Sequence, residues 1–282
     1  MSLDENIPGQ GPIRTTQNVG HDFMLSKWYL DCVSEKGEAF VGYAATLRWK
    51  GLELQYSSVL VHSKSTPAWT RTTLRQSSPP DIAGDGIHWS CPSLKVDGHW
   101  TALSPPIARD LIEARTGALQ WRCYQPHARA SIHVDRNHRI QGFGYVERID
   151  LSIPPWQLNI NTLRWGRFLC ECNAVVWIKC DGCDGSQSHV FFNGNEISDC
   201  SVADTGITLE RGRITLALRD SSVLREGTLV STALSMIPGI TRLLPKKILR
   251  THECKWLSKG RLIAGEAPPR EGWAIHEVVN FL

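Results

Sequence analysis

The sequence predicts an all-β fold in which antiparallel strands build sandwich- or barrel-like lobes, with one or two short helices. Three observations carry this prediction. Segments such as HARASIHV at residues 127–134 alternate apolar and polar side chains with the two-residue period of a strand. Turn-forming pairs recur between these segments along the chain. The best helical segment, residues 240–250, is interrupted by Pro245, which limits it to one or two turns.

The first half of the chain begins without regular structure and continues as strands. Residues 1–20 mix proline, glycine and polar side chains without periodicity, so we expect a flexible lead-in. A hairpin is predicted over residues 93–103, with Asp97-Gly98 as its two-residue turn, because such a turn needs positive φ angles. The other strands are predicted at residues 27–33, 39–49, 52–62, 118–124 and 127–134, with turns at residues 35–37 and 50–51.

The second half repeats this pattern. Strands are predicted at residues 142–153, 163–180, 213–220 and 228–234, with turn pairs at residues 137–138, 181–182, 193–194 and 211–212. A weak echo relates Gly42-Tyr43 and the later Leu47-Arg48-Trp49 to Gly144-Tyr145 and Leu163-Arg164-Trp165. We therefore divide the chain into a first lobe at residues 21–140 and a second lobe at residues 141–282.

Composition excludes several classes of partner. The 31 basic and 28 acidic residues give a net charge of +3, which is too weak a field to attract nucleic acid. The apolar stretches are far shorter than the roughly 20 residues that a transmembrane helix needs. The nine cysteines are irregularly spaced and no secretory leader opens the chain, so we expect a cytoplasmic protein. The oligomeric state is left open.

Tryptophan is the unusual component, with eleven residues. Large flat rings in such number favour contact with something apolar and extended, so we expect a hydrophobic small molecule to bind inside the protein. The candidate binding residues are mostly aromatic: Trp28, Tyr56, Trp156, Trp165, Arg167, Trp177, Trp256 and Trp273.

The segment at residues 142–168 gives the candidate acid. Strand alternation places Tyr145 and Glu147 on one face, and burial there would raise the pKa of the carboxyl group, making it a proton donor at neutral pH. Alternatively, Glu147 forms a structural ion pair with Arg164 or Arg167. The candidate catalytic residues from this segment are Glu147, Tyr145 and Arg164.

The C-terminal segments combine aromatic and titratable residues. Glu253 and Lys255 share a strand face and are expected to pair with each other. Trp273 and Glu277 share a face in the next segment, whereas His276 points to the opposite one. His276 is a candidate base or a wall residue.

Metal and cofactor chemistry is not predicted. Cys180-x-x-Cys183 is preceded by Cys170 and Cys172, but no second tight pair completes the tetrahedral set that zinc requires. The sequence also contains no Gly-x-Ser-x-Gly elbow, no HExxH motif and no phosphate-binding glycine loop.

The run Gly142-Phe143-Gly144-Tyr145-Val146-Glu147, followed by Trp165-Gly166, resembles the family that groups carotenoid hydratases, tocopherol cyclases and lipocalin-like Diels-Alderases. Lys27-Trp28-Tyr29 is similar to that family's aromatic first strand. The resemblance spans residue 21 to the end. It implies two lipocalin-like β lobes with a ligand cavity, and neither a metal nor an organic cofactor. In the family the acid is followed almost at once by Trp-Gly, whereas here residues 148–164 intervene.

Two classes of function follow. The first is a cofactor-independent isomerase, cyclase or hydratase for a terpenoid- or polyketide-like substrate, working by acid catalysis from Glu147 or by folding the substrate for a pericyclic reaction. The second is a non-catalytic carrier of a hydrophobic ligand. A purely structural protein would instead have a filled core.

Overall fold

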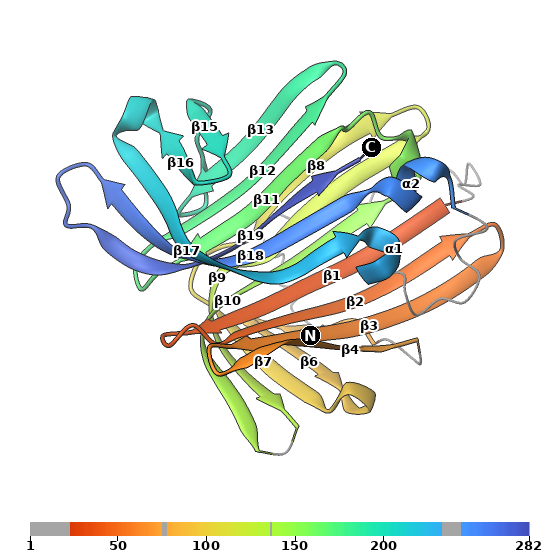
Figure 1. Ribbon diagram of the computed structural model, residues 1–282, viewed down its shortest axis with the longest axis horizontal. Coiled ribbons are helices and arrows are strands. Elements are labelled where there is room, and N and C mark those ends of the chain that lie inside the picture. Colours follow the sequence, from red (N-terminus) through yellow and green to blue (C-terminus); the bar gives the residue numbers. More distant parts are fainter. Residues whose placement is uncertain (1–22, 75–77, 136, 233–243, 282) are drawn as a thin grey trace, which may run out of the picture.

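The computed structural model describes residues 23–74, 78–135, 137–232 and 244–281, and contains two antiparallel sheets (Figure 1). The first sheet has the strand order β4-β3-β2-β1-β10-β9-β7-β6-β5, and β8 pairs with β9. Its strands are β1 (Phe23–Ser34), β2 (Ala39–Trp49), β3 (Leu52–Ser63), β4 (Thr66–Thr73), β5 (Asp81–Ala83), β6 (Gly86–Cys91), β7 (Val96–Ala102), β8 (Ile107–Ala114), β9 (Gly117–Val134) and β10 (His138–Leu151).

The second sheet has the order β14-β13-β12-β11-β19-β18-β17-β16-β15. Its strands are β11 (Thr162–Leu169), β12 (Ala174–Gly182), β13 (Gly185–Phe192), β14 (Asn195–Glu196), β15 (Cys200–Ala203), β16 (Gly206–Leu209), β17 (Ile214–Thr228), β18 (His252–Ala264) and β19 (Arg270–Asn280). The two short helices are α1 (Leu229–Thr232) and α2 (Lys246–Arg250). The predicted all-β class, with two lobes and one or two short helices, is therefore confirmed.

The two sheets have the same topology. In each, four strands form a meander, and the last strand of the lobe pairs with the first: β10 with β1, and β19 with β11. Strand β10 crosses the predicted boundary at residues 140/141 and belongs wholly to the first sheet, so the sheets change over between Leu151 and Thr162. That the lobes are separate domains stays a prediction. The Gly-Tyr echo links β2 with β10, which are not corresponding strands.

Strand alternation gives the molecule three main cores. One face of each sheet encloses a core of its own, and the first of these contains Trp28, Trp89 and Trp100. The other faces of the two sheets pack on each other and bury a third core between them. Each lobe thus buries both faces of its central strands, which explains why the runs in β1, β2 and β12 are almost continuously buried.

Four local predictions were wrong, one of them the single strand at residues 163–180, which is interrupted between β11 and β12. Asp97-Gly98 lies inside β7, and the turn before it is a 3-10 helix (Pro92–Leu94) closed by Lys95 at a φ of 56°. Because proline fixes the φ angle at the start of such a turn, the chain turns at Pro92 and not at Asp97-Gly98. Residues 229–232 of a predicted strand are helix α1, and Asp181 and Gly182 end β12 instead of turning.

Other expectations fall only partly within the described residues. Helix α2 begins directly after Pro245, as expected for a residue that cannot continue a preceding helix. The predicted start of this helix at residue 240, and the predicted lead-in at residues 1–20, lie outside the described residues. Within the described segments, neither helix has the length or apolarity to cross a bilayer.

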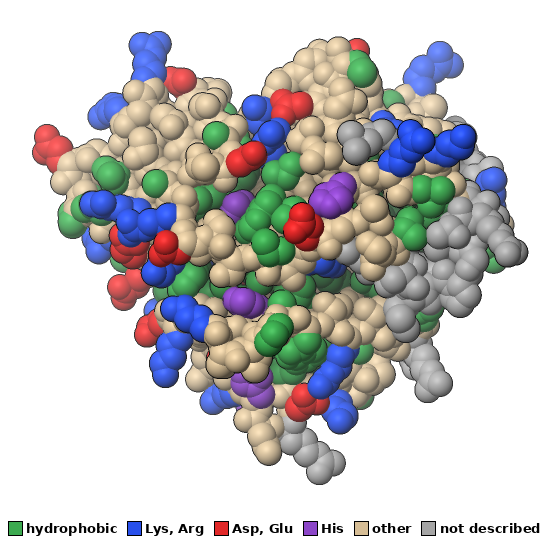
Figure 2. All heavy atoms as spheres, viewed as in Figure 1, with side chains coloured by type: hydrophobic (Ala, Val, Ile, Leu, Met, Phe, Trp, Pro, Cys, Tyr) green, Lys and Arg blue, Asp and Glu red, His purple; other side chains and the backbone are tan. Residues whose placement is uncertain are grey.

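On the face in Figure 2, basic and acidic side chains are interspersed.

The glycines of the Gly-Phe-Gly motif have a packing reason. A Cβ atom on Gly142 would lie 1.9 Å from the carbonyl oxygen of Val33, and one on Gly144 would lie 2.6 Å from that of Asp31. Strand β10 therefore approaches β1 too closely at this point for any side chain.

We expect Gly142→Ala to lower the free energy of unfolding by about 3 kcal/mol, because backbone must move to admit the methyl group. Gly86→Ala is the control, since the atom nearest to a Cβ atom there, the carbonyl oxygen of Ala83, would lie 3.3 Å away. Urea denaturation of both variants tests this, and equal stabilities would contradict the packing role of Gly142.

Candidate functional site

Aromatic and charged side chains meet between the two sheets in a region that we call the interlobe layer. It is made by β1, β2, β9 and β10 from the first lobe and by β11, β12, β18 and β19 from the second. Tyr29 and Trp165 pack edge to face across it, with ring centroids 4.8 Å apart, and Tyr145 packs on Trp165 at 5.7 Å. The first strands of the two lobes, β1 and β11, thus lie face to face.

A fully buried ion pair joins the lobes beside these rings. Arg167 on β11 donates from Nε and Nη2 to the two carboxylate oxygens of Asp31 on β1, at 3.0 and 2.8 Å. Both side chains are 0% exposed. The Tyr29 hydroxyl also donates to Asp31 at 3.0 Å, and Arg167 Nη1 donates to the carbonyl oxygen of Trp273 at 2.8 Å. Every polar group of the pair therefore has a partner, as burial requires.

Glu147 on β10 is the second buried acid of the layer. Its Oε2 accepts three hydrogen bonds: from Trp121 Nε1 at 2.5 Å, from the Tyr145 hydroxyl at 2.7 Å and from Trp165 Nε1 at 3.1 Å. Burial raises the pKa of this carboxyl group, and the three donors offset only part of that rise. The raised pKa predicted from the sequence is confirmed.

Glu147 does not form the ion pair that was the alternative prediction. Arg167 binds Asp31, while Arg164 points outward and binds Asp181 and Asp204. Alternate residues of β11 face opposite sides of the sheet, so Arg164 cannot reach the layer that Arg167 enters.

The bonding of Glu147 places its acidic proton. All three donors converge on Oε2, and the described residues offer no hydrogen bond to Oε1. An oxygen that accepts three hydrogen bonds is a poor place for a proton. In the neutral acid the proton is therefore on Oε1, the oxygen left free to donate.

Glu277 holds the corresponding position in the second lobe. Glu147 lies opposite Tyr29 in the pairing of β10 with β1, and Glu277 lies opposite Trp165 in the pairing of β19 with β11. Glu277 forms an ion pair with Lys255. Burial would raise the pKa of Glu277, but the ammonium groups of Lys255 and Lys27 outweigh it and lower that pKa. Two corresponding carboxyl groups thus have pKa values shifted in opposite directions, a pattern typical of acid–base sites.

Further charges surround Glu277. We call Lys27, Tyr43, Arg225, Glu253, Lys255 and Glu277 the interlobe polar cluster. Arg225 on β17 binds Glu253 at 2.9 Å and donates to the Tyr43 hydroxyl at 3.3 Å. The Lys255 ammonium lies 4.9 Å from the centroid of the Trp165 ring. The predicted pairing of Glu253 with Lys255 was wrong, because each finds its partner on a neighbouring strand.

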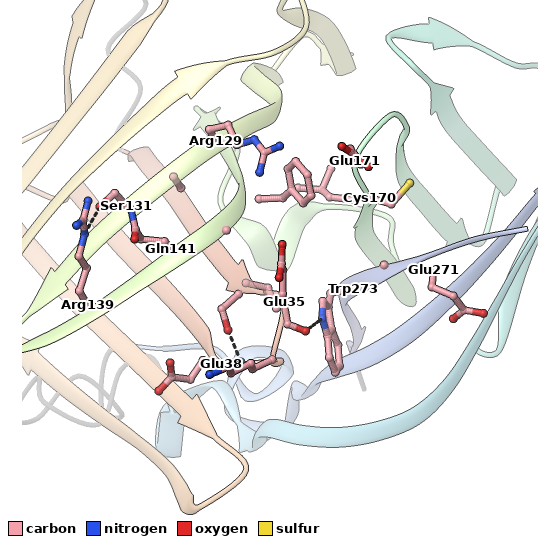
Figure 3. A pocket seen from close by; sticks show the side chains of 18 of the residues that line it. Glu35, Glu38, Arg129, Ser131, Arg139, Gln141, Cys170, Glu171, Glu271 and Trp273 are labelled. Carbon is pink, nitrogen blue, oxygen red and sulfur yellow. Dashed lines mark hydrogen bonds between the residues drawn. The ribbon is translucent and has the colours of Figure 1, made fainter.

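A cleft of about 970 Å³ opens between the lobes at the other end of the layer (Figure 3). Its apolar part is lined by Val33, Phe143, Leu169 and Trp273. Each of them lies two positions along its strand from a buried residue of the layer: Asp31, Tyr145, Arg167 and Ile275, respectively. Charged side chains surround them, among them Arg129, Glu35 and Glu171.

The cleft does not reach Glu147. Three fully buried side chains lie between the cleft and Glu147: Asp31 on β1, Arg167 on β11 and Tyr145 on β10. In the opposite direction, the next residues facing the layer are half-buried: Lys27, Tyr56, Ile149, Leu163 and Glu277. Glu147 is therefore separated from the cleft, and the side chains on its other side are only half-buried.

The structure gathers half of the predicted site residues. Tyr145, Glu147, Trp165, Arg167 and Tyr56 face the interlobe layer, and Trp273 borders both the layer and the cleft. Trp28 lies in the core of the first lobe, and Trp156 packs on Trp49 at the end of the layer. The remaining four lie on the far face of the second sheet: Arg164, Trp177, Trp256 and His276.

His276 has a structural environment. Its Nε2 is 2.8 Å from the Ser258 hydroxyl, and its ring stacks on Trp256. Burial lowers its pKa to about 4, so the ring is neutral at pH 7. As predicted, it points away from the face that carries Glu277.

Metal-binding groups lie away from the layer. All nine cysteines, each in a described segment, are free thiols. His88, Asp97 and His99 on β6 and β7 have ligand atoms within 4.8 Å of one another and could hold a cation. His88 and Asp97 are half-buried and His99 is exposed, and His88 Nε2 already lies 2.9 Å from the Asp97 carboxylate.

The sequence analysis missed Lys27, Asp31, Lys255 and Glu277 as site residues. A signal was present in β1, where Lys27, Tyr29 and Asp31 alternate with the apolar Trp28, Leu30 and Cys32. A strand with such alternation usually has one face in solvent, so the pattern by itself does not indicate a buried site. Only the second sheet buries this polar face.

We expect Arg167→Met to lower the free energy of unfolding by about 3–5 kcal/mol, since it leaves the Asp31 carboxylate buried without its partner. Arg164→Met on the same strand is the matched control and should cost less than about 1 kcal/mol, because its ion pairs are partly exposed. The double variant Asp31→Leu/Arg167→Met should lose less than the sum of its single changes. Additive losses in urea denaturation would contradict the coupling.

No protein-family profile matches the sequence, and no protein of curated function matches it. Solved structures do match the fold. CghA with Sch210972 superposes with a TM-score of 0.59 at 10% identity, covering 92% of this chain and 89% of CghA. A putative AttH from Nitrosomonas europaea gives 0.57 at 12% identity, covering 99% of this chain and 100% of that protein.

Kievitone hydratase from Nectria haematococca gives a TM-score of 0.51 at 9% identity, covering 90% of this chain and 88% of the hydratase. These matches span nearly the full length of each protein, so they include both sheets. The chain therefore shares the fold of these three proteins, with its two antiparallel sheets.

Proposed function

We propose that this protein is an enzyme that acts on a hydrophobic terpenoid- or polyketide-like small molecule between its two lobes, using Glu147 as the acid. The observation that carries the proposal is the hydrogen bonding of Glu147. Three donors hold Oε2 in a desolvated aromatic setting, and burial raises the pKa of the carboxyl group, so Oε1 is the oxygen from which the neutral acid would donate its proton.

The surroundings of Glu147 suit proton transfer to a double bond or a carbonyl group. Transfer to either creates positive charge on the substrate, which the faces of Tyr29 and Trp165 would stabilise. Glu277 stays ionised beside Lys255 and could accept a proton from the substrate in a second step. An isomerase, a cyclase and a hydratase all use this sequence of protonation and proton loss. One of the structural neighbours is, by its name, a hydratase.

The second candidate is a carrier of a hydrophobic ligand. The observation that favours it is that Glu147 fixes two tryptophans and one tyrosine, a role that a wall residue would also serve. Conversion of the ligand separates the two functions.

We expect Glu147→Gln to lower conversion at least 100-fold while leaving fold and binding intact, because the amide keeps the shape of the acid but has no acidic proton. The ligand extracted from purified Glu147→Gln protein would be incubated with wild type and analysed by liquid chromatography. Glu171→Gln, at the cleft, is the matched control and should keep full activity.

Conversion at the wild-type rate by Glu147→Gln would contradict the acid role. Recovery of unchanged ligand from every variant would indicate a carrier. Modest losses at several positions, without one large loss at Glu147, would indicate that the layer only orients its substrate for a pericyclic reaction.

The protonation of Glu147 is testable without a substrate. We expect a protonated-carboxyl infrared band that persists above pH 4.5, the ordinary pKa of glutamate, and is missing in Glu147→Gln but present in Glu277→Gln.

Because the folded-state pKa of Glu147 is raised, folding favours the protonated form. This stabilisation is complete below pH 4.5 and is lost as pH rises through the folded-state pKa. The stability of wild type should therefore fall relative to Glu147→Gln over that range. If chemical denaturation gave a difference in free energy of unfolding between the two proteins that did not change with pH, the raised pKa of Glu147 would be contradicted.

A further inference from the structure

Lys27 is the one member of the interlobe polar cluster that has a charge but no charged partner in contact. It lies on β1, half-buried, at the end of the layer away from the cleft. Its ammonium group is 4.8 Å from the centroid of the Tyr43 ring, and the described residues give it no hydrogen bond or ion pair. Arg225 and Lys255, in contrast, bind Glu253 and Glu277.

The charges of the cluster therefore do not cancel. Two carboxylates and three cations leave one positive charge, and this charge belongs to Lys27. Burial lowers the pKa of Lys27, and the nearby Arg225 and Lys255 add to that effect against the attraction of Glu277 and Glu253. An ammonium group in such surroundings is costly unless something compensates it. Uncompensated charges of this kind are concentrated at functional sites.

A second donor lies beside Lys27. The hydroxyl oxygen of Tyr43 accepts a hydrogen bond from Arg225, so its own hydrogen is free to be donated. Tyr56 is half-buried and lies on the strand next to Tyr43, on the same face of the sheet. A cation with adjacent hydroxyl donors is the arrangement that binds a negatively charged oxygen.

We propose that Lys27 and Tyr43 bind the anionic oxygen group of the ligand, a carboxylate, and that the apolar body of the ligand extends along the aromatic side chains toward Glu147. This inference rests on the proposed function for the location of the ligand. It adds the substrate class, a lipophilic molecule with one negative charge at the end away from Glu147.

Two fluorescent probes with nearly the same skeleton test the proposal. Anilinonaphthalene sulfonate carries a negative charge, whereas N-phenylnaphthylamine is neutral. We expect Lys27→Met to weaken binding of the sulfonate about tenfold or more, the usual effect of losing a charged hydrogen bond, and to change binding of the neutral probe less than twofold. Arg129→Met, which removes a cation from the cleft, is the matched control and should leave both affinities unchanged.

Thermal denaturation of Lys27→Met gives a second readout. Because Lys27 has no charged partner in contact, the variant should unfold at the same temperature as wild type or higher. Equal loss of affinity for both probes, or a clear loss of stability, would show that Lys27 is structural and overturn the proposal. Unchanged sulfonate binding, a loss caused by Arg129→Met, or failure of wild type to bind the sulfonate would overturn it as well.

The same titrations on Glu147→Gln separate this proposal from the proposed function. Probe binding requires no proton transfer, so the variant should bind the sulfonate within twofold of wild type even where it converts no ligand. If Glu147→Gln keeps its activity while Lys27→Met loses the sulfonate, the anion site stands and the acid role fails. If Lys27→Met binds the sulfonate normally while Glu147→Gln is inactive, the reverse holds.

Discussion

The ion pair between Asp31 and Arg167 determines how the two lobes meet. Both side chains are removed from water, and each would be strongly destabilising without the other. Their two hydrogen bonds have one geometry, so the first strands of the two sheets, β1 and β11, face each other in a single register. That register places Tyr29 against Trp165 and brings Glu147 within reach of the Trp165 indole.

The identical strand order of the two sheets explains why the site has two carboxyl groups with different properties. Glu147 and Glu277 hold corresponding positions, each opposite an aromatic residue of the first strand of its lobe. Their neighbours differ: indole and hydroxyl groups surround Glu147, while Lys255 lies beside Glu277. Neutral donors leave the cost of burial dominant, whereas an ammonium group overcomes it, and the two pKa values move apart.

The ion pair also divides the space between the lobes. On one side lies the 970 Å³ cleft, whose charged walls include Arg129 and Glu171. On the other side lie Glu147 and the interlobe polar cluster. The larger hollow is the usual candidate for a binding site, but here the acid with the raised pKa lies beyond the ion pair, away from it. A role for the cluster therefore explains more of the buried charge than a role for the cleft.

The sequence by itself determined the strand content, the two lobes and the shared face of Tyr145 and Glu147, because alternation and turn chemistry act over a few residues. It also offered Glu147 as a candidate buried acid, with a structural ion pair as the alternative. The pairing of Asp31 with Arg167, and of Lys255 with Glu277, was decided only by the tertiary structure. Asp31 and Arg167 are 136 residues apart, and a polar face on a strand has no local feature that distinguishes solvent from a second sheet. Packing of one lobe on the other made that choice.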